Sequence, residues 1–212
     1  MIHYNILLKE KILPAVTFNS IDEVLPVAEA ILRGGLSIVE IAFRSKVAAE
    51  SITIIKKNFP EMSVGAGTLL TVNQVEQAVN AGAEFGLAPG FNPVTCKSAR
   101  EKKLPFIPGV MTPSEIELAS TMSFDILKLF PAAQLGGADF LRAIDGPYGQ
   151  LNLQFIPMGG VNLSNLNEYL KLKNVIAVGG SWLATRALIE SKNYPAIRRN
   201  VEEALNKVAV TD

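Results

Sequence analysis

A lysine inside an apolar run is the residue of this sequence that most clearly suggests covalent chemistry. Lys128 lies in the run 126–131, which Pro131 closes, and short apolar runs bounded by a breaker are typical of strands buried on both faces. An ammonium group there must be paired, must extend to solvent or must lose its proton. A deprotonated lysine is a nucleophile towards carbonyl carbons. We therefore expect Lys128 to form a Schiff base. The alternative is a lysine at a strand end with its amine in solvent.

A second apolar run, 38–43, contains a carboxylate and is followed at once by a guanidinium. Glu40 lies inside this run, where a carboxylate needs a partner. It can act as general acid and base beside Lys128, or it can simply form an ion pair with that lysine. Arg44 comes four residues later, near the predicted strand end. A guanidinium there suits a carboxylate or phosphate of a substrate, although it can also be a solvated loop arginine.

Small and hydroxyl residues at other strand ends suggest further binding groups. Gly65 and Gly67 let the backbone approach a ligand, and the Thr68 hydroxyl can add a hydrogen bond, although small residues also relieve crowding inside a barrel. Pro89 and Phe130 stand at two more strand ends.

Two glycine pairs follow the last two predicted strands, one strand–helix unit apart. In parallel barrels, the loops at these places often bind phosphate through backbone N–H groups. The sequence therefore predicts a phosphate site made of Gly159, Gly160, Gly179 and Ser181.

The elements that must position these residues alternate along the chain. Eight apolar runs are predicted as strands: 12–16, 38–43, 63–68, 85–89, 106–110, 126–131, 154–157 and 175–178. Helical segments separate them, and another helix is expected at 4–11. Such alternation indicates a parallel sheet covered by helices. We therefore expect an α/β fold: a single domain over residues 1–212, a (β/α)8 TIM barrel with an extra N-terminal helix. A doubly wound open sheet is the alternative, but residues 17–20 lack the glycines that its first turn would need.

Composition narrows the classes of function. Hydrophobic residues make up 49% of the chain, and the net charge is +0, so we expect neither nucleic acid nor a membrane as a partner. Cys96 is the single cysteine and His3 the single histidine, which argues against disulfides, multi-histidine metal sites and Ser-His-Asp triads. We expect no metal and no cofactor. No run of 18 or more apolar residues and no signal-peptide core occurs, so a cytoplasmic location is expected.

Six short motifs together resemble one known family. They are 40–44 (EIAFR), 65–68 (GAGT), 88–90 (APG), 128–131 (KLFP), 158–160 (MGG) and 179–182 (GGSW). Their order along essentially the whole chain is similar to that of bacterial 2-dehydro-3-deoxy-6-phosphogluconate (KDPG) aldolases, which also include 4-hydroxy-2-oxoglutarate (KHG) aldolases. The resemblance implies a metal-independent, class I aldolase on a (β/α)8 barrel, assembled as a homotrimer.

The resemblance also implies a role for each matching residue. Lys128 would form the Schiff base, and Glu40 would be the general acid and base. Arg44 and Thr68 would hold the pyruvate carboxylate, while Pro89 and Phe130 would form the pocket wall. Gly159, Gly160, Gly179 and Ser181 would bind the phosphate. Met158 departs from the family, which usually has threonine there and associates that position with stereochemical choice at the substrate hydroxyl.

The expected reaction is cleavage of KDPG to pyruvate and D-glyceraldehyde 3-phosphate, and also of KHG to pyruvate and glyoxylate. Because of Met158, the galactonate-derived epimer is an alternative substrate. Two further classes stay open: a phosphate-binding barrel isomerase or synthase without a covalent step, and a sugar-phosphate binding protein without catalysis.

Overall fold

Strands and helices alternate through residues 4–209, the part of the chain that the computed structural model describes; His3 lies outside the described residues. The strands are β1 (Ile12–Val16), β2 (Ile38–Ala42), β3 (Ser63–Gly67), β4 (Phe85–Leu87), β5 (Phe106–Ile107), β6 (Gly109–Val110), β7 (Ile126–Leu129), β8 (Gln154–Pro157) and β9 (Val178–Gly180). Each pairs with its neighbours in parallel.

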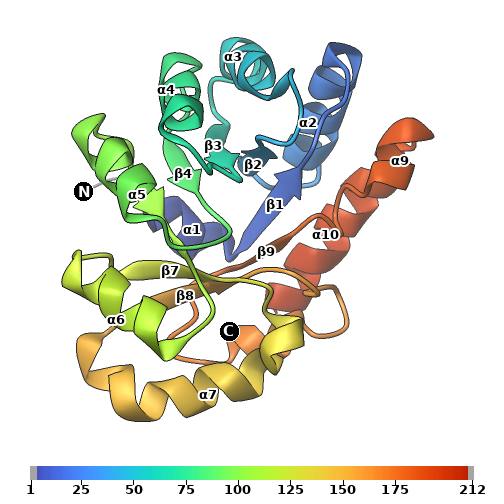
Figure 1. The fold of residues 1–212 in the computed structure, drawn as a ribbon. Helices are drawn as coiled ribbons and strands as arrows, with labels where there is room; N and C mark the ends of the chain where they lie inside the picture. The colour runs from blue at the N-terminus through green and yellow to red at the C-terminus, as the bar shows by residue number, and fades with distance from the viewer. Residues whose placement is uncertain (1–3, 210–212) are drawn as a thin grey trace.

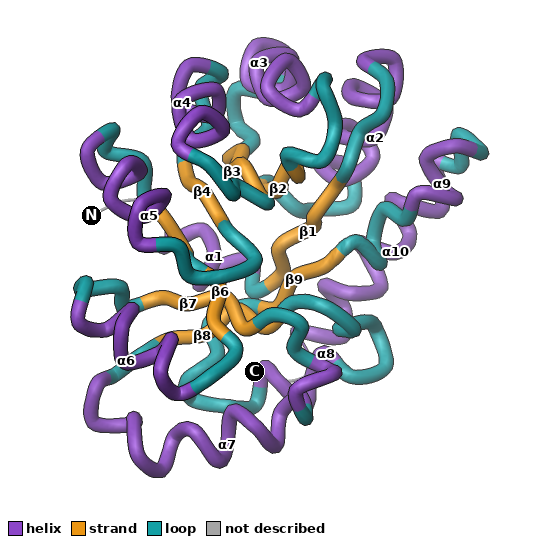
Figure 2. The backbone as a smooth tube through the Cα atoms, in the orientation of Figure 1, coloured by secondary structure: helices purple, strands orange, loops and turns teal. Residues whose placement is uncertain are grey.

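Apart from the N-terminal helix, the helices lie outside the strands, as the backbone trace shows (Figure 2). They are α1 (Tyr4–Glu10), α2 (Val24–Arg33), α3 (Ala48–Asn58), α4 (Val72–Asn80), α5 (Pro93–Glu101), α6 (Pro113–Thr121), α7 (Gly137–Tyr148), α8 (Leu166–Leu170), α9 (Arg186–Glu190) and α10 (Tyr194–Ala209). Three short 3-10 turns accompany them: Ile21–Glu23, Ala133–Leu135 and Gly149–Leu151. No helix among residues 4–209 is both long and apolar enough to cross a bilayer.

The strands form two curved parallel sheets (Figure 1). One has six strands in the order β5-β4-β3-β2-β1-β9, and the other has three in the order β6-β7-β8. Isolated bridges between Phe155 and Val175 and between Met158 and Gly179 link β8 to the chain around β9. The prediction of an α/β fold with parallel strands is confirmed.

The predicted strand at 106–110 is two strands, β5 and β6. Pro108 separates them because proline has no backbone N–H to give to a ladder. Its carbonyl still accepts a hydrogen bond from the Lys128 N–H, at 2.9 Å. The segment therefore stays next to β7 despite the break. The predicted strand at 106–110 thus connects the two sheets, with β5 in one and β6 in the other.

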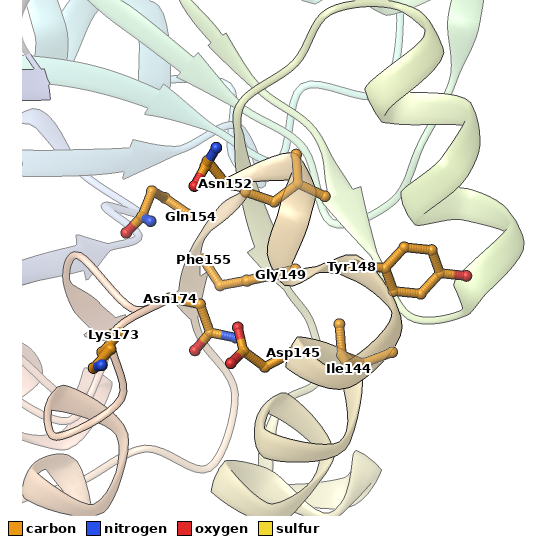
Figure 3. A pocket seen from close by; sticks show the side chains of 10 residues that line it. Ile144, Asp145, Tyr148, Gly149, Asn152, Gln154, Phe155, Lys173 and Asn174 are labelled. Atoms are coloured by element: carbon orange, nitrogen blue, oxygen red, sulfur yellow. The ribbon is translucent and has the colours of Figure 1, made fainter.

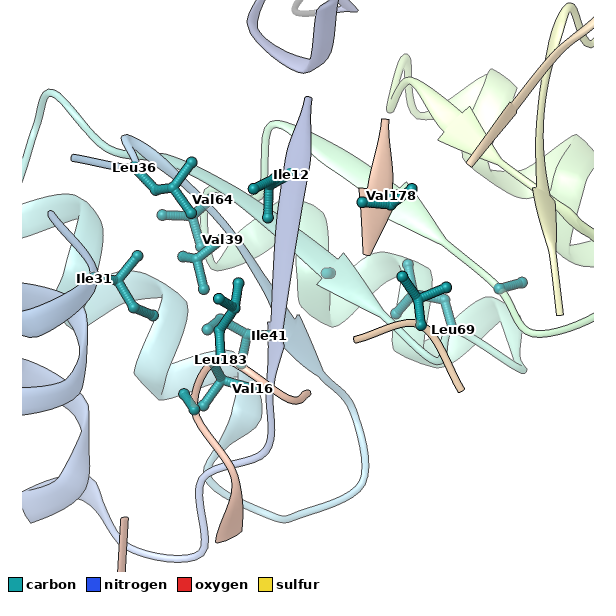
Figure 4. Close-up of a cluster of buried hydrophobic side chains, with 14 of the residues drawn as sticks. Ile12, Val16, Ile31, Leu36, Val39, Ile41, Val64, Leu69, Val178 and Leu183 are labelled. Carbon is teal, nitrogen blue, oxygen red and sulfur yellow. The ribbon is translucent and has the colours of Figure 1, made fainter. Parts of the chain in front are cut away.

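Side-chain alternation divides the apolar residues between two layers. Val39 and Ile41 of β2 belong to the larger cluster, which packs the sheet against the helices (Figure 4). Ile38 belongs to a second cluster, enclosed by the curved strands, to which Leu7 of α1 contributes. Because successive strand residues point to opposite faces, Glu40 shares the enclosed face with Ile38. The same count from Ile126 puts Lys128 on that face too.

Several boundaries differ from the sequence expectation. The last strand was expected at 175–178 but is Val178–Gly180, so the glycines lie in the strand and not in a loop after it. Helix α9 was not predicted. Asn165 occupies the N-cap position of α8, and the Ser164 hydroxyl donates to Asn162 Oδ1. Thr71 and Thr112 cap α4 and α6, where each hydroxyl oxygen accepts a backbone N–H.

Candidate active site

Lys128 and Glu40 meet inside the curve of the sheets. Lys128 Nζ lies 3.5 Å from Glu40 Oε1, and the two residues are only 4% and 2% exposed. The amine also lies 5.4 Å from the centre of the Phe130 ring. The alternative of a solvated strand-end lysine is therefore wrong for Lys128. The ion pair itself is compatible with both readings of Glu40, as structural partner and as acid–base group.

A glycine on the neighbouring strand makes room for the Glu40 carboxylate. Ala42 of β2 pairs with Gly67 of β3, and a Cβ on Gly67 would overlap Glu40 Oε1. The second oxygen, Glu40 Oε2, is buried and has no hydrogen-bond partner among the described residues. Such an atom loses its hydration without replacement, so it is a ready acceptor for a substrate hydroxyl or a bound water. Gly67 was expected to approach a ligand, but its close neighbour is this carboxylate.

A cavity of about 260 Å³ opens above the pair. Besides Lys128 and Glu40 it is lined by residues at or just after the carboxyl ends of β1, β2, β7, β8 and β9: Ala15, Thr17, Ala42, Arg44, Phe130, Met158, Gly159, Gly160, Val161, Gly180, Ser181 and Trp182. In parallel α/β sheets, chemistry is concentrated at this end of the strands. The volume is sufficient for a small acid, and the buried amine is at its floor.

Arg44 lines the cavity and is exposed, as a group that holds an incoming anion should be. Its Nε donates to Thr68 Oγ1 at 3.3 Å. Thr68 itself is not part of the cavity lining, and its φ of 58° is in the left-handed region. A β-branched residue rarely adopts this conformation. Thr68 therefore acts on the cavity through Arg44, by orienting the guanidinium.

The glycine pair after β8 lies as predicted, but the pair in β9 does not. Gly159 and Gly160 line the cavity with φ values of 88° and 77°, which glycine adopts at little cost. In β9 the lining glycine is Gly180, beside Ser181. Gly179, the glycine that the sequence suggested, faces Met158: a Cβ there would lie 2.7 Å from Met158 Cε. Its smallness therefore accommodates a side chain.

Pro89 also lies apart from the cavity lining. It is packed against Gly109, where an added Cβ would overlap the Pro89 carbonyl carbon. Phe130, predicted with it, does line the cavity. Pro89 thus joins the ends of β4 and β6 and does not contact the cavity.

Comparison with known proteins decides the family. Residues 4–200 match the profile of a family described as KDPG and KHG aldolase. The 2-dehydro-3-deoxy-phosphogluconate aldolase of Haemophilus influenzae is 40% identical over 196 residues, covering 92% of each chain. The KHG/KDPG aldolase of Escherichia coli K12 is 36% identical over 201 residues, covering 95% of this chain and 93% of its own. This chain belongs to the KDPG and KHG aldolase family.

Solved structures of this aldolase family have the same fold. The KDPG aldolase of Legionella pneumophila, which holds pyruvate as a covalent carbinolamine intermediate, superposes with a TM-score of 0.89. It is 34% identical, and the match covers 94% of this chain and 96% of that one. The Zymomonas mobilis enzyme with 3-phosphoglycerate gives a TM-score of 0.88 at 30% identity, with coverage of 95% and 93%.

Sequence reasoning missed several lining residues of this aldolase. Thr17 and Trp182 both line the cavity. From the sequence, Thr17 was considered only as part of a segment without glycines, and Trp182 only as part of a motif. Both lie within two residues of a strand end, which is the signal that could have identified them. The Trp182 Nε1–H is buried and has no partner among the described residues.

The only cysteine is unsuited to nucleophilic chemistry in this aldolase. Cys96 lies on α5 and is 1% exposed. Burial raises the pKa of its thiol from 9.0 to about 11, so the reactive thiolate is scarce near neutral pH. Among residues 4–209, no group of three or more His, Cys, Asp or Glu side chains is placed to hold a metal ion.

A second cavity, of about 350 Å³, does not include the Lys128 amine in its lining. Figure 3 shows the side chains around it. Its lining comes from the end of α7 and the beginning of β8, including Tyr148, Asn152 and Gln154. Gln154 begins β8 and Met158 follows its end, so the two cavities lie at opposite ends of this strand. Of these two cavities, Lys128 and Glu40 line only the smaller one.

Proposed function

We propose that this protein is a class I aldolase that cleaves KDPG to pyruvate and D-glyceraldehyde 3-phosphate, and KHG to pyruvate and glyoxylate. One observation supports this proposal most: a lysine amine and a carboxylate, 3.5 Å apart and almost fully buried, lie at the floor of an open cavity. A buried amine paired with a proton acceptor is what imine chemistry needs.

Lys128 begins the reaction and provides the electron sink. Its Nζ attacks the C2 ketone, and loss of water gives a protonated imine. The electron pair of the C3–C4 bond then forms the C2=C3 bond of an enamine, while the π pair of the imine moves to the nitrogen. Covalent catalysis of this kind replaces one difficult step by several easier ones.

Glu40 moves the protons. It accepts the C4 hydroxyl proton, directly or through a water, as the aldehyde leaves. The remaining enamine takes a proton at C3, and hydrolysis of the imine releases pyruvate and the free amine. The unpartnered Oε2 of Glu40 is the acceptor available for these transfers.

The other lining residues bind the two ends of the substrate. Arg44, oriented by Thr68, binds the carboxylate. Gly159 and Gly160, with Gly180 and Ser181, bind the phosphate through backbone N–H groups and a hydroxyl. Phe130 limits the space beside the imine. Binding at both ends orients the reacting carbons.

Borohydride reduction with pyruvate tests the covalent step. An imine gives an irreversible pyruvate-sized mass increase, and peptide mapping should place it on Lys128. Lys128→Met should abolish the adduct and nearly all cleavage, measured through pyruvate release. Lys97→Met is the matched control, because Lys97 is exposed and pairs only with Glu101 along α5. An adduct that persists in Lys128→Met, or no adduct in the wild type, overturns the proposal and favours a non-covalent isomerase, synthase or binding protein.

The galactonate-derived epimer is a second candidate substrate, because Met158 lines the cavity and offers no hydroxyl. Its side chain is 3% exposed and packs against Gly179. Steady-state assays on both C4 epimers decide between them. A higher kcat/KM for the galactonate-derived epimer would replace the main substrate while leaving the Schiff base in place.

The single domain is a closed eight-stranded barrel preceded by helix α1. Support comes from the Lys128 N–H that bonds to Pro108 between β5 and β6, and from the Ile176 N–H that bonds to the Phe155 carbonyl at 3.1 Å. In a closed barrel, the hydrogen bond to Phe155 should protect the amide of Ile176 from hydrogen exchange as strongly as the amides of β2 are protected. Fast exchange at Ile176 in the native protein would indicate an open sheet.

The protein assembles as a homotrimer and acts in the cytoplasm. Large apolar side chains are exposed between the strands and the helices that follow them, or in the first turns of those helices, namely Leu70, Val72, Val94 and Met111. Val94 is 65% exposed, and exposed apolar surface favours association with another copy. Light scattering should give three times the chain mass of 22.8 kDa, and Val94→Lys should lower it. A monomeric wild type would contradict this assembly, and cell fractionation tests the location.

A further inference from the structure

An ion pair joins two loops at the rim of the cavity. Arg186, at the start of α9, donates through Nη1 and Nη2 to both carboxylate oxygens of Glu23; the Nη1 distance is 2.9 Å. Arg186 Nη1 also approaches the Thr17 carbonyl at 3.4 Å, and its Nε donates to Glu190 at 2.8 Å. The Arg186 and Glu23 side chains are 33% and 16% exposed. A two-point guanidinium–carboxylate contact fixes direction as well as distance.

Glu23 is itself fixed to the loop after β1. Its Oε2 accepts the Asn19 N–H at 2.9 Å and the Ser20 N–H at 3.5 Å. Glu23 closes the capping box of the 3-10 turn at Ile21–Glu23. The carboxylate therefore holds the loop in one conformation and at the same time accepts the hydrogen bonds from Arg186.

The pair lies where the strand ladder ends. β1 and β9 pair through Ile12, Leu13 and Pro14, and the last partner is Gly180. Beyond Pro14, the segments that follow β1 and β9 separate around the cavity. Thr17 lines one edge, and Ser181 and Trp182 line the other. Arg186 reconnects the two edges, because it contacts the Thr17 carbonyl while belonging to the helix that follows Trp182.

We propose that Arg186 and Glu23 are positioning residues that set the width of the cavity between Thr17 and Ser181, and thereby the affinity for the phosphate end of the substrate. This inference rests on the proposed function. Neither side chain lines the cavity, so their effect passes through the two edges. Loss of the pair lets the edges separate, whereas Lys128 and Glu40, on β7 and β2, keep their geometry.

Two substrates of different length separate positioning from simple loss of stability. KDPG carries a phosphate, and KHG has none but undergoes the same imine chemistry. Arg186→Met should raise KM for KDPG about tenfold or more, since small displacements at a binding group have large effects. Its kcat for KDPG, and both constants for KHG, should change less than about twofold. Glu23→Gln should act in the same direction.

Control variants complete the test. Arg186→Lys keeps the charge without the two-pronged geometry, so it should recover part of the KM. Arg198→Met removes a more exposed ion pair, with Glu202 on α10, and should leave the kinetic constants for both substrates unchanged. Thermal melts establish that each variant is folded at the assay temperature.

The outcomes are distinguishable. Equal loss on KDPG and KHG, or unchanged KM for KDPG in folded Arg186→Met and Glu23→Gln, overturns the positioning role. Absence of the pyruvate adduct in the wild type overturns the proposed function instead, before any variant is compared.

Discussion

The Glu40 carboxylate occupies the space that a side chain on Gly67 would need. Glu40 is on β2 and Gly67 on the neighbouring β3, two positions further towards the cavity. The carboxylate therefore leans along its strand over the glycine, towards Lys128. The position of the carboxylate depends on the absence of a side chain at Gly67 as much as on the backbone of Glu40.

Gly67→Ala should displace Glu40 and reduce turnover. The added methyl overlaps Oε1, so the carboxylate must leave its place beside the amine. Because positioned proton transfer contributes about 10²–10⁴-fold, we expect kcat to fall about 100-fold or more, as in Glu40→Gln. Pyruvate release measures kcat, and borohydride trapping should still label Lys128.

Gly146→Ala is the matched control for that substitution. Gly146 lies in α7, where a Cβ meets nothing within 4 Å. Alanine there should leave kcat unchanged. Full activity in Gly67→Ala would show that the carboxylate can act from another position.

Removing one member of the buried pair should destabilise the protein more than removing both. Lys128→Met leaves the Glu40 carboxylate buried without its partner, which typically costs about 3–5 kcal/mol. Adding Glu40→Gln removes the buried charge and should recover much of that loss. Urea unfolding of both single variants and the double variant measures the coupling. Additive losses in the double variant would mean that the two groups do not interact in the folded state.

The Glu23–Arg186 pair predicts a loss of stability in acid. The side-chain hydrogen bond from Arg186 holds the pKa of Glu23 below its ordinary value of 4.5, although burial opposes this shift. A carboxyl group with a lowered folded-state pKa stabilises the fold above its unfolded pKa, and this contribution disappears as the pH falls through the folded pKa. The stability difference between wild type and Glu23→Gln should therefore be largest near neutral pH and shrink below pH 4.5.

Urea unfolding at a series of pH values measures this difference. Glu29→Gln is the control, because its i,i+4 pair with Arg33 is exposed and such pairs contribute little. A wild-type advantage that grows as the pH falls would have the wrong sign and would refute the assignment.

Cys96 should be almost unreactive in the folded protein. Its thiol is 1% exposed, and burial raises its pKa to about 11, so both access and thiolate concentration are low. A disulfide reagent that releases a coloured thiolate should react with Cys96 slowly in buffer. It should react at once in urea, where the chain is unfolded. Rapid labelling of the native protein would indicate local opening of α5.

A single charged residue inside each of two apolar runs identified the two central groups. Glu40 stands two residues after Ile38, and Lys128 two after Ile126. A strand period of two puts each on the same face as an enclosed apolar residue. The parallel α/β fold followed from the same local pattern, because strands flanked by helical segments must pair in parallel.

Only the tertiary structure decided which small residues line the cavity and which make room for a neighbouring side chain. Gly67 gives room to Glu40, and Gly179 gives room to Met158, whereas Gly180 lines the cavity. Thr17 and Trp182, far apart in the chain, reach the same rim, and Arg186 connects their two loops to Glu23. These relationships arise from the register between strands and from contacts between distant segments. They depend on how the folded chain packs, which no local pattern of residue types encodes.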